Sequence, residues 1–109
     1  LNIENISIVN FKINNPKSDQ FTFNSPFPNP FNPETTINYY IENEGIIGIN
    51  IFNLRGEFIT NLFKENKNQG YHSMIWNASQ YSSGTYFIEI NYEQNESKIT
   101  KIQKVILVK

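Results

Sequence analysis

The sequence predicts an all-β protein in which about seven strands form an antiparallel sandwich of two sheets. Aromatic residues make up 15% of the chain and isoleucine is its main aliphatic residue, and both kinds of side chain favour strands. Alanine, the strongest helix former, occurs once, at Ala78. Short segments of alternating apolar and polar residues follow one another without an amphipathic helix between them, which favours antiparallel over parallel pairing.

The composition argues against several classes of protein. A chain of 109 residues fits one domain, and a net charge of −1 lacks the basic surface that binds nucleic acid. Because cysteine is absent, there is neither a disulfide framework nor a thiolate site. No apolar run approaches the roughly 20 residues of a transmembrane segment. We see no N-terminal signal peptide and expect the leader of an exported protein on a longer precursor or elsewhere in the sequence.

A proline-rich segment, Pro28-Asn29-Pro30-Phe31-Asn32-Pro33, divides the chain. Each proline fixes φ and removes a backbone donor, and the residue before it is pushed toward extended geometry. Neither a helix nor a central strand is therefore expected to continue through this segment. We expect a domain over residues 28–109, a polar linker over residues 15–27 and a lead strand over residues 1–14.

The lead strand is expected to contain a β-bulge. Its apolar residues alternate on one face as far as Ile8 and continue on the other face from Val9 onward. The strand either opens the domain or ends a preceding one. In the linker that follows, Phe21 and Phe23 are candidates for anchoring the chain to the sandwich.

Six strands are expected after the prolines. Their ranges are Thr35–Ile41, Ile46–Leu54, Phe58–Phe63, a strand that contains His72, Met74 and Trp76, Thr85–Tyr92, and Ser97–Lys109.

The first three of these strands are defined by alternation and by the turns between them. Thr35–Ile41 alternates cleanly and ends in the turn Glu42–Gly45. Ile46–Leu54 alternates until Phe52, where its phase shifts. Asn53–Gly56 is typical of a tight hairpin connection, because glycine readily adopts positive φ.

The last three strands carry the strongest core signals. Gly70 closes a polar loop, after which His72 and Trp76 share one face, so the single tryptophan is expected in the core. Thr85–Tyr92 alternates most clearly, with its even-numbered residues inward. The final strand includes Val105–Val108, which is apolar on both faces and therefore typical of a strand covered on both sides.

No pattern for catalysis, or for metal or cofactor binding, is visible. His72 is the only histidine, and we favour a partly buried imidazole bonded to backbone over a catalytic or metal-binding one. Asp19, the only aspartate, lies in the expected linker, so a Ser-His-Asp relay is disfavoured. Zinc needs clustered ligands that the chain lacks, and Glu42 with Glu44 is too little for calcium. We therefore predict that the protein is not an enzyme and uses no cofactor.

Five landmarks occur in order along the chain. They are Pro28, Asn29, Pro30 and Phe31 with Thr35 after them; Asn53-Leu54-Arg55-Gly56; Gly70 and His72 leading to Trp76; Ser83, Gly84 and Tyr86; and Lys104, Val105, Ile106, Leu107, Val108 and Lys109. Together they resemble the type A C-terminal sorting domain of proteins exported by the type IX secretion system of Bacteroidota. The resemblance covers residues 21–109.

This resemblance implies an immunoglobulin-like sandwich at the end of a larger secreted protein, with a cargo domain on its N-terminal side. It implies recognition by the outer-membrane translocon and its shuttle, and removal by a sortase-like peptidase. The protein would reach the cell surface or the medium via the periplasm. Many family members carry aspartate where Asn53 stands, although asparagine suits the same turn. The related flagellar hook-capping domain normally has a longer insert where this chain has the short loop Asn77–Ser82.

We expect the last strand, which ends in Lys104–Lys109, to be the recognised element, because a strand at a chain end can add to a partner's sheet edge. Alternatively, it only completes the domain's own sheet. Two other functions stay open. One is a structural or adhesive module, in which Leu1–Ile13 fills a neighbour's sheet edge and yields a homo-oligomer or fibre. The other is carbohydrate binding through the exposed rings expected at Phe87, Tyr40 and Tyr81.

Overall fold

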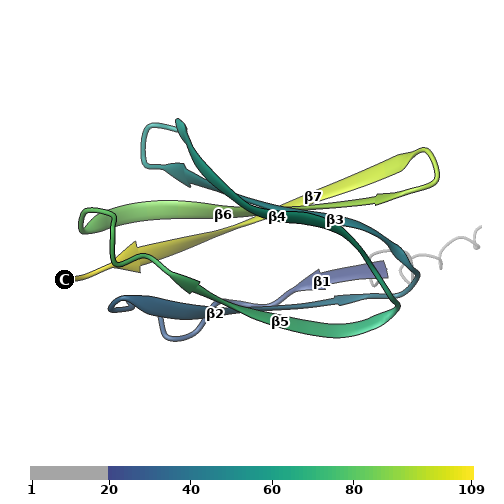
Figure 1. Cartoon of the computed structure of the whole chain (residues 1–109), viewed down its shortest axis with the longest axis horizontal. Coiled ribbons are helices and arrows are strands. Elements are labelled where there is room, and N and C mark those ends of the chain that lie inside the picture. The colour runs from purple at the N-terminus through teal and green to yellow at the C-terminus, as the bar shows by residue number, and fades with distance from the viewer. Residues whose placement is uncertain (1–19) are drawn as a thin grey trace, which may run out of the picture.

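The computed structural model describes residues 20–109, which form two antiparallel sheets packed face to face (Figure 1). Seven strands occur in this part of the chain: β1 (Phe21–Phe23), β2 (Glu34–Ile41), β3 (Gly45–Asn53), β4 (Phe58–Lys67), β5 (Gly70–Asn77), β6 (Gly84–Gln94) and β7 (Ser97–Leu107). The smaller sheet has the order β1-β2-β5 and the larger one β4-β3-β6-β7. The predicted all-β antiparallel sandwich is thereby confirmed.

The strand that precedes the prolines, β1, is not the lead strand that the sequence predicted. Phe21–Phe23 forms β1 and pairs with the end of β2, so these residues belong to the sandwich although they lie in the segment expected as a linker. The alternation Phe-Thr-Phe turns both rings inward, where Phe21 and Phe23 are buried. The lead strand expected over residues 1–14 lies outside the described residues.

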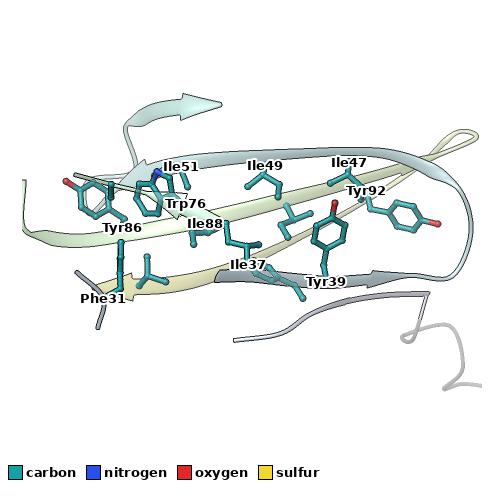
Figure 2. Packing of buried hydrophobic residues seen from close by; sticks show 14 of the residues in the cluster. Phe31, Ile37, Tyr39, Ile47, Ile49, Ile51, Trp76, Tyr86, Ile88 and Tyr92 are labelled. Atoms are coloured by element: carbon teal, nitrogen blue, oxygen red, sulfur yellow. The ribbon is translucent and has the colours of Figure 1, made fainter. Parts of the chain in front are cut away.

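The core is built from the inward positions of both sheets (Figure 2). The larger sheet contributes isoleucines of β3 and β6, and the smaller sheet contributes alternate residues of β2 together with Trp76. The alternation predicted for these strands and the burial of the tryptophan are confirmed. The fully buried isoleucines are Ile37, Ile41, Ile47, Ile49, Ile51, Ile88 and Ile90.

One expectation for β7 is wrong. Val105 and Leu107 are buried, but Ile106 is 37% exposed, and Val108, just beyond the strand, is 50% exposed. The reason is that the larger sheet packs against the smaller one on a single face. Although the run is apolar throughout, only its inward residues are covered.

Replacing Trp76 should test how far the core depends on this one side chain. Trp76 is 3% exposed and packs against three aromatic rings, so Trp76→Ala is expected to lower the free energy of unfolding by about 3–5 kcal/mol. Urea denaturation measures the change. Ile75→Ala, at the neighbouring exposed position, is the control and should change stability by less than about 0.5 kcal/mol. Equal effects of the two variants would contradict this core assignment.

Alkaline pH should destabilise the fold through a buried phenol. Burial, aided by the negative charge of Glu65, raises the pKa of Tyr39 to about 12, against about 10 in an unfolded chain. Between these values the unfolded state loses the proton and the folded state keeps it, so stability falls as pH rises from about 10 toward 12. Burial also raises the pKa of Tyr92.

Tyr39→Phe should therefore show a shallower loss of stability across this alkaline range, with a residual slope from Tyr92. Denaturation midpoints measured at several pH values provide the comparison. An identical slope in the variant and the unmodified chain would mean that the Tyr39 phenol titrates alike in the folded and unfolded states.

Candidate functional site

Four landmark segments lie together at one end of the sandwich, which we call the motif end (Figure 1). Strand register brings them there, because Gly84 pairs with Leu107, Asn53 with Tyr86, and Glu34, just after the prolines, with Asn77. The motif end comprises the proline segment Pro28–Pro33, the β3–β4 turn Asn53–Gly56, the loop Ser82–Gly84 and the last residues Lys104–Lys109.

Within the motif end, Asn29 and Phe31 pair with the outer edge of β7. The Phe31 N–H donates to the carbonyl of Ile106 (2.9 Å), and the Val108 N–H donates to the carbonyl of Phe31 (2.9 Å). The Asn29 amide makes two neighbouring bonds: Nδ2 donates to the Lys104 carbonyl (3.0 Å), and Oδ1 accepts from the Ile106 N–H (2.9 Å). Asn29 and Phe31 thus occupy the place of a further strand beside β7.

The proline segment is itself held from the smaller sheet. The buried hydroxyl of Thr35 donates to the carbonyl of Pro28 (2.8 Å), and the Ala78 N–H donates to the carbonyl of Pro33 (2.8 Å). Since prolines cannot donate, their carbonyls are the groups available for such bonds. The segment is fixed at both ends.

Three landmark aromatic residues form the core beneath this end (Figure 2). The rings of Phe31 and Trp76 lie 5.4 Å apart, and those of Trp76 and Tyr86 lie 5.8 Å apart in an edge-on arrangement. Both separations fall in the favourable range for aromatic pairs. The Tyr86 hydroxyl donates to the carbonyl of Ser82 (2.7 Å), which fixes the β5–β6 loop to the same cluster.

The last residue of the sequence is bound by the β5–β6 loop. The Lys109 N–H donates to the hydroxyl of Ser83 (3.0 Å). Its ammonium group donates to the carbonyls of Ser79 (2.6 Å) and Tyr81 (2.9 Å). Ser83 therefore contributes a direct contact to the end of the chain.

The Asn53 turn lines one side of a surface hollow, and the segment Ser82–Tyr86 lines the other side. Asn53 Oδ1 accepts from the N–H groups of Arg55 (2.9 Å) and Glu57 (3.0 Å), and Gly56 has a φ of +83°. Aspartate would offer the same acceptor oxygen, whereas asparagine also donates from Nδ2 to Glu57 Oε1 (2.6 Å). The turn and the Ser82–Tyr86 segment enclose a volume of about 520 Å³.

Two polar side chains of β7 join the sheets farther from the motif end, and the sequence analysis missed both. Lys101 Nζ donates to the carbonyl of Phe21 (2.5 Å), and Gln103 Nε2 donates to that of Phe23 (3.0 Å). Both side chains occupy inward positions of β7. The signal that identifies such contacts is two polar residues in the inward phase of β7, between the apolar inward residues Ile99 and Val105.

The structure separates Gly70 and His72 from the other landmarks. β5 runs from Gly70, paired with Ile41, to the motif end at Asn77. His72 stacks on Tyr39 with ring centroids 5.3 Å apart, and its Nε2 lies 2.7 Å from the carbonyl oxygen of Asn68. This is the partly buried, backbone-bonded imidazole that the sequence analysis favoured. Within residues 20–109, no group of three or more His, Cys, Asp or Glu side chains is placed to hold a metal ion.

The rings expected to be exposed are half-buried. Phe87, Tyr40 and Tyr81 are each only partly accessible, and Tyr81 lies 6.0 Å from the ring of Trp76. Tyr81 packs on the core instead of forming a free sugar-stacking surface. Among residues 20–109, the most exposed aromatic residues are instead Tyr71 and Phe27.

Exposed apolar residues gather on the outer face of the larger sheet. Ile102 of β7, 56% exposed, borders a hollow of about 370 Å³ that Phe52 and Phe87 also line. Ile106 lies farther along the same face of β7, toward the motif end, with the exposed Lys104 between it and Ile102. Exposed apolar side chains gathered on one face are typical of interaction sites.

Comparisons with known proteins identify the family. No curated protein matched the chain. Across residues 20–109 we find no helix with the length and apolarity needed to cross a membrane. The model of the secretion system C-terminal sorting domain matches residues 25–107, a range that includes the proline segment, the Asn53 turn and the whole of β7. The chain belongs to the family of C-terminal sorting domains of the type IX secretion system.

Proposed function

We propose that the export machinery recognises this protein through the last strand, supported by the motif end. Family membership makes the chain a C-terminal sorting signal for type IX secretion, which directs a protein to the cell surface or out of the cell. The observation that carries the proposal is that separate landmark segments make direct contact with the last six residues: Asn29 and Phe31 on one side and Ser83 on the other.

The partners follow from the family. Recognition by the secretion machinery and attachment to an N-terminal cargo are implied by membership. We assign recognition to the outer-membrane translocon and its shuttle, and removal of the domain to a sortase-like peptidase. Residues 28–109 together with β1 would form the sorting domain, and the segment before β1 would join it to the cargo. In this assignment the domain is a signal and carries out no reaction.

The side chains available to a partner are those on the outward face of β7. Val105 and Leu107 are buried in the sandwich, whereas Ile102 and Ile106 are exposed. Asn29 and Phe31 occupy the outer edge of the strand near the motif end. A partner on this face therefore meets Ile106, the exposed Lys104, and then Ile102 with the hollow beside it.

An export assay tests recognition through this face. A fluorescent carrier fused before the chain is produced in a host with a type IX system, and the exported fraction is measured. Ile102→Lys should reduce export severalfold, because it places a charge in the apolar surface. Ile75→Lys is the matched control: Ile75 is 57% exposed against 56% for Ile102, but it lies on the smaller sheet.

Deletion of Val105–Lys109 should abolish export in the same assay. Denaturation of the purified fusions shows whether Ile102→Lys and Ile75→Lys leave the fold equally stable. Export that survives the deletion would contradict recognition of the last strand. Equal losses from the two lysine variants would place the recognised surface elsewhere than on the outward face of β7.

A further inference from the structure

β7 is an edge strand, and the backbone groups along its free edge could pair with a strand of another chain. In the larger sheet its only strand partner among the described residues is β6. Every second residue of such a strand turns its N–H and C=O groups outward, where they can pair with another chain. Natural edge strands are commonly shielded by lysines, by bulges or by a covering segment.

The two parts of β7 are shielded in different ways. The part from Ser97 to Lys104 carries three lysines, which disfavour pairing with a second sheet edge. The run Val105–Val108 has no charge and only β-branched or leucine side chains, a composition typical of segments that pair with copies of themselves. Lysines therefore protect one part of the edge and leave the other part unprotected.

The proline segment covers the part that lacks lysines. Between Lys104 and Val108, the outward carbonyls of Lys104 and Ile106 accept bonds from Asn29 and Phe31, respectively. The outward N–H groups of Ile106 and Val108 donate to the Asn29 side chain and the Phe31 carbonyl. The outward backbone groups from the Lys104 carbonyl to the Val108 N–H are therefore engaged and not available to a new strand.

We infer that Asn29–Phe31 is an edge cap, which prevents β7 from pairing with β7 of a second copy of the chain. The latent interaction surface is the outer edge of Lys104–Val108, and the partner that fits it is an identical edge. In an antiparallel pair centred on Ile106, Lys104 of each copy faces Val108 of the other, so no lysine opposes a lysine. The apolar runs would then lie side by side, related by a two-fold axis.

Asn29→Ala weakens the cap, because it removes two of the four bonds that hold the segment against β7 while the Phe31 ring stays in the core. Asn32→Ala is the matched control, since Asn32 is exposed in the same segment and makes neither of these bonds. In the full chain, Asn29→Ala should speed hydrogen exchange at the Ile106 amide about tenfold or more, as loss of a hydrogen bond implies. The Val105 and Leu107 amides, which face β6, should stay protected.

Asn29→Ala should also shift the chain from monomer toward dimer as concentration rises, measured by sedimentation velocity, whereas Asn32→Ala should not. A second substitution, Ile106→Lys, places a charge at the centre of the exposed edge and should restore the monomer. If Asn29→Ala stays monomeric, or its dimer persists with Ile106→Lys, the inference is overturned. If Asn29→Ala does not fold, Asn29→Asp provides a second test. It keeps the acceptor for the Ile106 N–H and should associate less than Asn29→Ala.

Discussion

The fold depends on the way in which one proline segment joins the two sheets. Phe27 pairs with Thr36 of β2 in the smaller sheet, and Phe31 pairs with Leu107 of β7 in the larger sheet. The segment between them therefore crosses the side of the sandwich where no regular ladder connects the layers. Prolines suit this role because they cannot donate a ladder hydrogen bond, which prevents the segment from continuing either sheet.

Much of the fold could be predicted from local patterns. The alternation in β2, β3 and β6 identified the buried positions, and the single tryptophan was placed correctly in the core. The prediction that β7 is buried on both faces was wrong, because an apolar run such as Val105–Val108 does not reveal whether its second face packs against another layer. β1 was assigned to the linker because three residues are too few for a periodicity to be recognised.

The site was predictable as a set of landmarks but not as an assembly. The bond between Asn29 and Ile106 joins residues 77 positions apart, and nothing in local composition reports such a pairing. The sequence also did not show that the landmarks lie at two separate places. Only the strand register shows that Trp76 reaches the motif end while His72, in the same strand, lies beside Tyr39. Lys101 and Gln103 also join the two sheets, because their side chains reach from β7 to backbone carbonyls of β1.

The order of these elements along the chain has a consequence for biosynthesis. Asn29 and Phe31 leave the ribosome long before their partners in β7, so the sandwich closes only after β7 has been translated. A product that stops before Lys104 lacks the residues that complete the sheet and cover Phe31. The folded domain thus reports that synthesis has passed β7.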